Sequence, residues 1–336
     1  MKQNLLDASL KAQPHQASHV ATTHRASSNE PTPQIRILLA VLTTGARSGP
    51  LRTCVDAISR LRPAAGVELS LLLVQNGAEA TTRELTSFLT VATPTTHVAL
   101  EPQVGIPFAR NRAIAEAIAR SADYLAFIDD DAAPDEDWLI QAIKVLRATK
   151  AEAVTGPQFP VFPRHTPHRL LNAAVYRAAR HDSERPCTWA ASNNVIFSID
   201  FVKKHGLTFN ETFTTGGSDK EYFKRFSRVG GIIRWAPRAI VREPVTSERL
   251  NLRWAVRRSW RLGTGGYRIE VATTSRPKAV TICVGKGVAY LAGGIAMLPL
   301  TIFPKHPGYV NGLCYLAHGA GFILGLTARF RPKTYV

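Results

Sequence analysis

Short apolar runs punctuate the first half of the chain. They carry few polar residues and do not alternate, which is typical of strands buried on both faces of a sheet. The pattern predicts five such strands, at residues 35–42, 69–74, 97–100, 124–128 and 151–155.

Between these runs, apolar residues recur every three or four positions, as on one face of an α-helix. This spacing predicts helices at residues 48–61, 80–89 and 106–120, and a fourth that opens at Pro134 and continues through Leu146. Strands that alternate with helices form a mostly parallel sheet covered on both faces. The predicted fold class is therefore α/β, with a Rossmann-like sheet.

Beyond residue 155 the alternation ends. The pattern predicts a proline-rich loop, a helix at 170–180 and a strand at 189–197 whose polar residues Ser192, Asn193 and Asn194 face a cleft. A further helix is expected at 219–229, with Ser218 as its N-cap.

The last sixty residues are apolar and rich in glycine. Residues 281–303 contain one charge, Lys286, and are long enough to cross a hydrocarbon core of roughly 30 Å. Residues 309–326 follow after a proline-rich turn, so the pair is predicted to form a helical hairpin. Basic residues flank both outer ends, which places those ends in the cytoplasm. A spanning hairpin, one lying in the inner leaflet and one buried in a soluble protein all remain open.

Three regions are therefore expected along the chain. Residues 1–34 are polar and lack the apolar segment of a secretory signal, so they are predicted to be a disordered tail. Residues 35–268 form the sheet domain, and residues 269–336 form a helical region associated with the membrane.

The chain is strongly basic. It has 42 Lys and Arg against 25 Asp and Glu, a formal net charge of +17. Such a charge favours anionic partners: nucleic acid, acidic lipid or a phosphate-bearing substrate. No zinc finger, RNP-type or KH motif is present, so nucleic acid is not expected as a partner. Four widely separated cysteines rule out a disulfide scaffold.

Three adjacent carboxylates, Asp129, Asp130 and Asp131, follow the predicted strand at 124–128. Ligands of such sheets bind outside the carboxyl ends of the strands. Adjacent carboxylates raise one another's pKa unless a cation compensates them, and hard oxygen ligands suit Mg²⁺ or Mn²⁺. The alternative is a solvated loop before a helix.

A second acidic site lies at residues 214–221, where Gly216 and Gly217 precede Asp219. A carboxylate at the start of a helix can act as a general base on a hydroxyl. The alternative is an ordinary acidic first turn.

Residues 224–268 hold twelve basic residues and two acidic ones. Arg249, Arg253, Arg257 and Arg261 recur every four residues, so a helix would align them in one stripe. Such a stripe could bind a diphosphate through paired contacts; a solvated face or a surface on anionic lipid are the alternatives. Residues 43–49 match neither a dinucleotide-binding nor a P-loop pattern.

Together these segments resemble glycosyl transferase family 2 with the GT-A fold. The resemblance covers about residues 35–265 and is carried by GIPFARN at 105–111, FIDDD at 127–131, GGSD at 216–219 and RRSWRLG at 257–263. The detailed pattern is similar to the bacterial exopolysaccharide branch of succinoglycan type.

The resemblance implies a role for each matching residue. Asp129 and Asp131 resemble the pair that meets Mg²⁺ or Mn²⁺ on a nucleotide diphosphate, and Asp219 matches the general base. The further substrate-binding residues that it implies, or that lie beside these motifs, are Thr43, Asn76, Arg110, Asp130, Arg257 and Arg261.

Two positions depart from the family pattern. Gln75 replaces an Asp expected to contact uracil, and Ser218 replaces a Glu before the base. The Gln-x-x-Arg-Trp motif of processive synthases is absent, which favours transfer of a single sugar.

The expected function is inverting transfer of one sugar from a nucleotide-diphosphate sugar, UDP-linked, to a hydroxyl of a glycan or lipid-linked acceptor. The expected setting is cell-surface polysaccharide biosynthesis at the cytoplasmic face of the membrane. The alternatives are a nucleotidyltransferase on a similar sheet, and a basic membrane- or nucleic-acid-binding protein with a degenerate transferase sheet.

Overall fold

The computed structural model describes residues 34–44, 48–77, 95–303 and 306–327. Residues 34–336 form one compact unit. The predicted helix at 80–89 and all but the last residue of the predicted tail at 1–34 lie outside the described residues.

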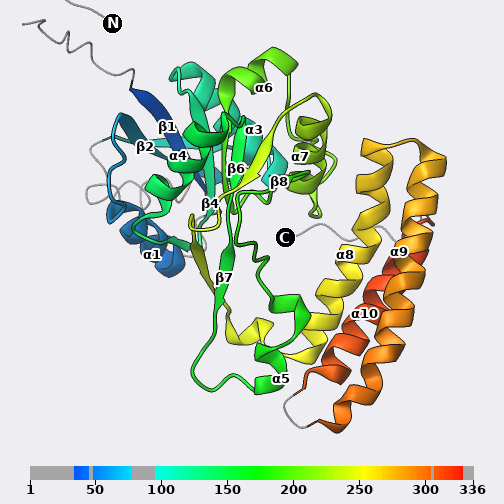
Figure 1. Ribbon diagram of the computed structural model, residues 1–336. Coiled ribbons are helices and arrows are strands. Elements are labelled where there is room, and N and C mark those ends of the chain that lie inside the picture. Colours follow the sequence, from blue (N-terminus) through cyan, green and yellow to red (C-terminus); the bar gives the residue numbers. More distant parts are fainter. Residues whose placement is uncertain (1–33, 45–47, 78–94, 304–305, 328–336) are drawn as a thin grey trace, which may run out of the picture. The chain divides into compact units, whose positions relative to one another are not determined.

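The main sheet begins with four parallel strands, adjacent in the order β3-β2-β1-β4 (Figure 1). They are β1 (Ile35–Thr43), β2 (Val67–Asn76), β3 (Thr96–Glu101) and β4 (Tyr124–Asp129). The sheet continues through β9 (Asn194–Ser198), β6 (Ala153–Thr155), β10 (Ile233–Trp235) and β8 (Pro186–Cys187). Strand β9 is antiparallel to both β4 and β6. The prediction of a mostly parallel sheet is confirmed.

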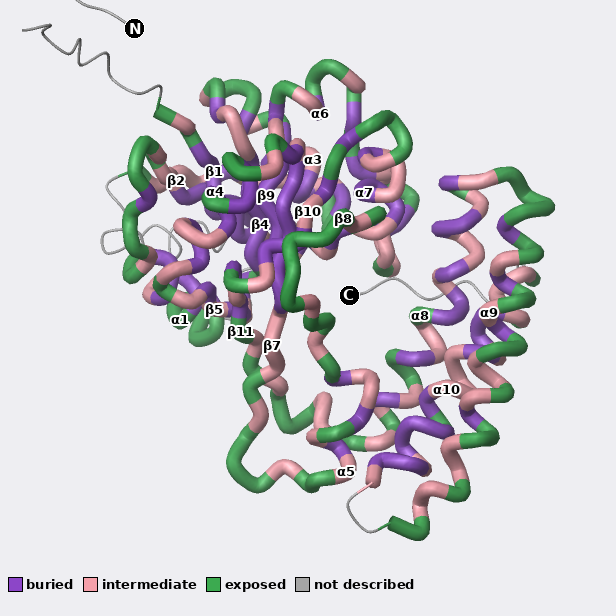
Figure 2. Tube along the Cα trace, viewed as in Figure 1, coloured by how far each residue is buried: buried purple, intermediate pink, exposed green. Residues whose placement is uncertain are grey.

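Helices cover both faces of this sheet, and alternate residues of β1 show it. Ile37, Leu39 and Val41 pack in one buried cluster with α1 (Ser48–Ser59) and α4 (Trp138–Thr149). Leu38 and Ala40 pack in a second cluster with α3 (Ile106–Ala119), α6 (Ile199–His205) and α7 (Ser218–Arg228). Figure 2 shows the central strands buried between exposed helix surfaces. This double cover explains why the strands are apolar without alternation.

A small second sheet corrects one prediction. Pro134 does not open a helix; it belongs to β5 (Ala133–Pro134), which pairs with β11 (Val241–Pro244), and β11 also pairs with β7 (Gln158–Val161). Helix α4 begins four residues later, at Trp138. Pairing with a strand more than a hundred residues away overrides the local helix-start signal of proline.

Three other boundaries differ from expectation. The predicted helix at 170–180 is two short turns, α5 (His168–Leu171) and a 3-10 helix at Ala174–Tyr176. The strand predicted at 189–197 starts only at Asn194, which is buried and receives a hydrogen bond from the Trp138 ring nitrogen at 2.8 Å. Ser218 is the first residue of α7 and not its cap, because Gly217 at φ 83° occupies the N-cap position.

The chain ends in three long helices, α8 (Leu252–Thr273), α9 (Arg276–Met297) and α10 (Gly308–Leu324). Helix α10 packs against both α8 and α9 (Figure 1). Glycines allow the close approach: a methyl group on Gly263 of α8 would lie 2.3 Å from the His318 carbonyl oxygen of α10. Helix α8 runs without a break across residue 268, the predicted boundary between the sheet domain and the helical region.

The two halves of the predicted hairpin differ. Among the described residues, one helix, Arg276–Ile302, is long and apolar enough to cross a membrane, and only 17% of its most apolar window is buried. Its exposed valines include Val280, Val284 and Val288. Helix α10, the second predicted half, has 17 residues and buries Val310, Cys314 and Phe322. Composition alone did not distinguish the exposed helix α9 from the more buried helix α10.

Candidate active site

The three carboxylates lie where β4 ends, as predicted. Asp129 is the last residue of the strand, and Asp130 is buried. Although Asp129 is reached by solvent, the protein packed around it raises its pKa to about 7; Arg110 opposes this shift, and Asp131, Glu243 and Asp130 add to it. A cation beside these carboxylates would oppose this shift and favour the charged form of Asp129.

An arginine that the sequence placed elsewhere lies beside these acids. Arg249 was expected in the helical stripe, but it belongs to a short 3-10 helix (Ser247–Arg249) before α8. Its guanidinium lies 3.6 Å from the Asp131 carboxylate and 2.7 Å from that of Glu243. The four-residue spacing gave no sign of this, because Leu250 and Asn251 separate the turn from α8.

Arg110 of α3 interacts through its charge with both Asp129 and Asp219, the predicted base. Its guanidinium donates hydrogen bonds to the hydroxyls of Ser192 and, at 2.6 Å, Ser218. Burial lowers the pKa of Arg110, and the charges of Asp219 and Asp129 oppose that shift. The sequence motifs did not predict the two serines as partners, although both had been noted, Ser192 as facing a cleft and Ser218 as a cap.

Asp219 lies in the first turn of α7 and accepts a hydrogen bond from the backbone N–H of Lys220 at 2.8 Å. Helix α8 holds the loop that leads to it. Arg268 donates to the Thr212 carbonyl at 2.6 Å and to the Thr215 hydroxyl at 3.0 Å. Ile269 packs so close to Gly217 that a methyl group there would lie 2.8 Å from its side chain.

A buried carboxylate joins the base-bearing helix to the C-terminal helices. Glu270 of α8, whose side chain is 5% exposed, accepts from Lys224 of α7 at 2.7 Å and from Lys286 of α9 at 2.9 Å. Burial raises the pKa of Glu270, but the two lysines outweigh it and hold the pKa below its ordinary value. Lys286, the single charge predicted in the apolar segment, is thus paired with a buried carboxylate.

The predicted nucleotide contacts lie at the same carboxyl edge of the sheet as the three acids, since Leu42, the residue before Thr43, pairs with Asp129. Thr43 and Asn76 end β1 and β2, and both are buried. The amide of Asn76 binds the backbone of the segment before α3: it donates to the Gln103 carbonyl at 2.6 Å and accepts from the Gly105 N–H at 2.7 Å. Asn76 therefore braces the start of the helix that carries Arg110.

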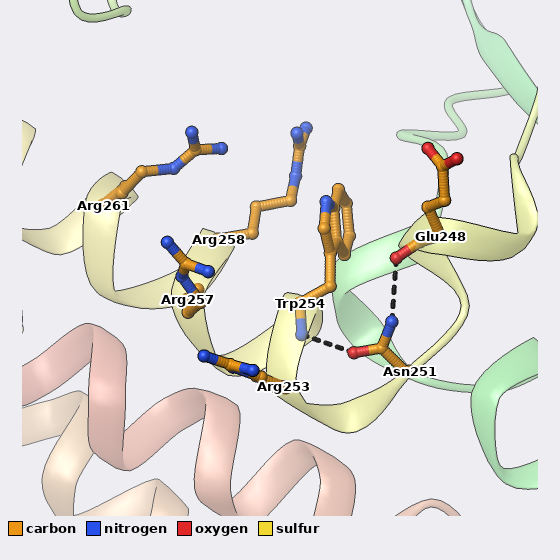
Figure 3. Close-up of a pocket in the computed structure, with 7 residues that line it drawn as sticks. All are labelled: Glu248, Asn251, Arg253, Trp254, Arg257, Arg258 and Arg261. Carbon is orange, nitrogen blue, oxygen red and sulfur yellow. Dashed lines mark hydrogen bonds between the residues drawn. The ribbon is translucent and has the colours of Figure 1, made fainter. Parts of the chain in front are cut away.

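The remaining predicted residues, Arg257 and Arg261, belong to α8. They line a pocket of about 300 Å³, shown in Figure 3. Its other lining residues are Glu248, Asn251, Arg253, Trp254 and Arg258. The Trp254 ring stacks on Tyr176, and the Arg258 guanidinium lies over the Trp254 ring. The pocket therefore has an ordered aromatic wall.

Comparison with known proteins agrees with the sequence motifs. The family described as Glycosyl transferase family 2 matches residues 41–223, more than half of the chain. Succinoglycan biosynthesis protein ExoM of Rhizobium meliloti (strain 1021) is 27% identical over 197 residues. That alignment covers 58% of this chain and 63% of ExoM, less than two thirds of its length. The predicted likeness to the succinoglycan-type branch is confirmed.

Solved structures share the fold at low identity. A mannosyltransferase from Pyrobaculum calidifontis, PcManGT, in complex with GDP-Man and Mn²⁺, has a TM-score of 0.54 at 17% identity and covers 89% of each chain. S. aureus TarS 1-349 in complex with UDP-GlcNAc has a TM-score of 0.50 at 12% identity, covering 88% of this chain and 82% of the other. These likenesses confirm the GT-A fold.

Proposed function

Since the chain belongs to glycosyl transferase family 2, we propose that it transfers a single sugar, with inversion, from a UDP-linked donor to a hydroxyl of a glycan or lipid-linked acceptor. The observation that carries the proposal is the position of Arg110. Its charge interacts with Asp129 on one side and Asp219 on the other. The proposed metal acids and the proposed base therefore belong to one site.

Asp129 and Asp131 are the proposed metal ligands. Within the described residues, no three His, Cys, Asp or Glu side chains form a complete metal site. Two carboxylates still fit Mg²⁺ or Mn²⁺, which take their other ligands from diphosphate oxygens and water. Burial is the main cause of the raised pKa of Asp129, and the charges of Asp131, Glu243 and Asp130 add to it. A cation beside these carboxylates would favour their charged forms. When bound, the cation neutralises charge on the departing diphosphate.

Arg249 supplies a second positive charge at the leaving group. It is held 2.7 Å from Glu243 and 3.6 Å from Asp131, so its guanidinium lies at the edge of the acid cluster. A prearranged cation of this kind stabilises charge that develops during bond cleavage. In this role Arg249 takes the place that the sequence suggested for Arg261.

Asp219 is the proposed general base. In-line attack requires an acceptor hydroxyl to be deprotonated on the face of the sugar opposite the leaving diphosphate. Arg110 fixes Ser218 beside this carboxylate, and Arg268 and Ile269 fix the preceding loop. Side chains locked by packing keep the base in position for the proton transfer.

On the donor side, we assign Thr43 and Asn76 to the nucleotide, Asp130 to the donor and Arg110 to the sugar. This assignment is supported by their placement at the carboxyl ends of β1, β2 and β4 and at the start of α3. Gln75 is fully buried and pairs with Thr43 on the neighbouring strand. Its side chain therefore lies beneath the surface of the proposed nucleotide site.

The proposal also includes association of the protein with the cytoplasmic face of the membrane. Val280, Val284 and Val288 are exposed at four-residue spacing on α9, which aligns them on one face. Arg276 and Lys278 lie at the start of the same helix. An apolar face with basic residues at its end suits an anionic leaflet. The likeness to ExoM supports a role in polysaccharide synthesis.

The test is a screen of purified protein against UDP-, GDP- and TDP-linked sugars, with and without Mn²⁺ or Mg²⁺. We expect slow release of UDP that depends on the metal and is lost in Asp131→Asn. Release of nucleotide monophosphate or pyrophosphate would instead indicate nucleotidyl transfer. No metal-dependent reaction with any donor would support the basic binding protein.

A further inference from the structure

Arginines on α8 connect the two ends of the candidate active site. Arg253, Arg257 and Arg261 are four residues apart, and Arg268 follows seven residues later, so all four share one helix face. Before this helix, Arg249 reaches Asp131. Towards its end, Arg268 binds the loop that leads to Asp219. The intervening arginines therefore lie on the stretch between the metal acids and the base.

The length of this row exceeds the length of the donor's diphosphate. An α-helix rises about 1.5 Å per residue, so Arg253 and Arg261 are about 12 Å apart along the axis. A diphosphate is two phosphorus atoms joined through one oxygen and is shorter than that. In the proposed function the donor diphosphate binds at Asp129 and Asp131, and Arg249 already lies 3.6 Å from Asp131. Arg257 and Arg261, farther along α8, are therefore placed to bind a second anion.

The pocket around these arginines is suited to a phosphate group. Four arginines and one acidic residue, Glu248, line it, and the side chains of Arg258 and Arg261 extend away from the helix in Figure 3. Guanidinium groups bind phosphate through paired hydrogen bonds. Trp254 forms a flat wall, held on Tyr176 at 5.6 Å between ring centroids.

We propose that this pocket binds the phosphate or diphosphate group of the acceptor, so that Arg257 and Arg261 recognise the acceptor and not the donor. This inference rests on the proposed function and names its substrate class. The acceptor must bring a hydroxyl to Asp219, and the row of arginines leads towards the loop that carries it. The same chemistry is offered by a lipid diphosphate or by a soluble phosphate ester.

The exposed valines of α9 favour the lipid source. Helix α9 belongs to the same helical region as α8, and Glu270 ties the two together through Lys286. A region with an apolar outer face and a basic pocket suits a molecule that combines an apolar tail with a phosphorylated head. The pocket is therefore assigned to a lipid-linked diphosphate that carries the acceptor sugar.

The experiment compares wild-type protein with Arg257→Gln/Arg261→Gln. The control is Lys203→Gln/Lys204→Gln, which removes two exposed positive charges from α6. Two quantities are measured: UDP affinity in the presence of Mn²⁺, and binding to phosphatidylcholine vesicles. Three vesicle preparations are compared: one carries a polyprenyl diphosphate, one the matching polyprenol and one phosphatidylglycerol. Soluble pyrophosphate is added as a competitor. Equal melting temperatures show that the variants are folded.

We expect the arginine variant to keep its UDP affinity. Its affinity for polyprenyl-diphosphate vesicles should fall by up to about tenfold for each arginine lost. The control should behave as wild type. A fall in UDP affinity with unchanged vesicle binding would assign the row to the donor and overturn the inference. Equal binding to phosphatidylglycerol vesicles would also overturn it, as would competition by pyrophosphate alone with no preference for the lipid. Binding of the lipid through these arginines without any nucleotide binding would support the pocket but contradict the proposed function.

Discussion

The sheet domain and the three C-terminal helices are built by opposite rules. In the sheet domain, branched and aromatic side chains fill two dense clusters. In the helices α8, α9 and α10, glycines make the closest contacts, valines face outward on α9 and the paired acid Glu270 is inside. Small residues at helix crossings are typical of packing where the surroundings are apolar. The proposed active site lies where these two regions meet.

This division assigns different tasks to the two regions. Most of the proposed donor and metal residues lie at the ends of strands, which a rigid sheet holds in place. The base loop and the arginine pocket depend on α8, which belongs by packing to the helical region. Damage to the helices should therefore impair handling of the acceptor more than binding of the nucleotide.

The largest expected effect is at the base. Asp219→Asn removes the proton acceptor but keeps the size of the side chain, so turnover should fall by about 10²-fold or more, while donor affinity stays normal. Steady-state transfer and nucleotide calorimetry on the same preparation would show the separation. An active variant would move the base elsewhere, with Glu221 in the same helical turn as the next candidate.

Glycines on α8 offer a matched test of the close packing. Gly263→Ala places a methyl group 2.3 Å from the His318 carbonyl, and overpacking of this kind lowers the free energy of unfolding by about 1–3 kcal/mol. Gly265→Ala meets no atom within 4 Å and should stabilise the helix by about 1 kcal/mol or less. Thermal unfolding of both variants in the same detergent tests whether α8 and α10 are in close contact. Equal effects would mean that α8 and α10 are not in close contact.

Glu270→Gln should loosen the link between the two regions. It leaves Lys224 and Lys286 without their partner, and because both lysines are partly exposed the loss should be about 1–2 kcal/mol, below that of a fully buried pair. The folded-state pKa of Glu270 lies below its usual 4.5. Its stabilisation is therefore complete above that pH and is lost as the pH falls through the folded-state pKa.

The measurement is the difference in unfolding free energy between wild type and Glu270→Gln as a function of pH. It should be constant near neutral pH and shrink in acid. Lys286→Met, which removes only the contact with α9, should show part of the effect. A difference that grows in acid would contradict the proposed charge of Glu270.

The last prediction concerns where the protein is found in the cell, and no loss of stability is expected. Val284→Asp/Val288→Asp adds two charges to exposed positions of α9 and should move the protein into the soluble fraction at low salt without detergent. Thr53→Asp/Ser59→Asp adds the same charge to exposed positions of α1 and should leave the protein with the membrane. A wild-type protein that is already soluble without detergent would refute the membrane seat.

Much of the sheet domain could be predicted from sequence, because its strands are continuous apolar runs and its acids directly follow one of them. The failures have a common physical origin. Pro134 and Arg249 are placed by partners distant in the chain, β11 and Asp131, which no local pattern encodes. The difference between α9 and α10 was also hidden, since hydropathy does not tell which of two apolar helices lies inside.

The central claim is that the acids at the end of β4 bind the nucleotide through a divalent cation. Calorimetric titration of UDP, with and without Mn²⁺, tests it on wild type, Asp131→Asn and Asp219→Asn. The account predicts that Mn²⁺ strengthens UDP binding to wild type and to Asp219→Asn, and that Asp131→Asn loses this gain. Wild-type affinity of Asp131→Asn for UDP in the presence of Mn²⁺ would contradict it.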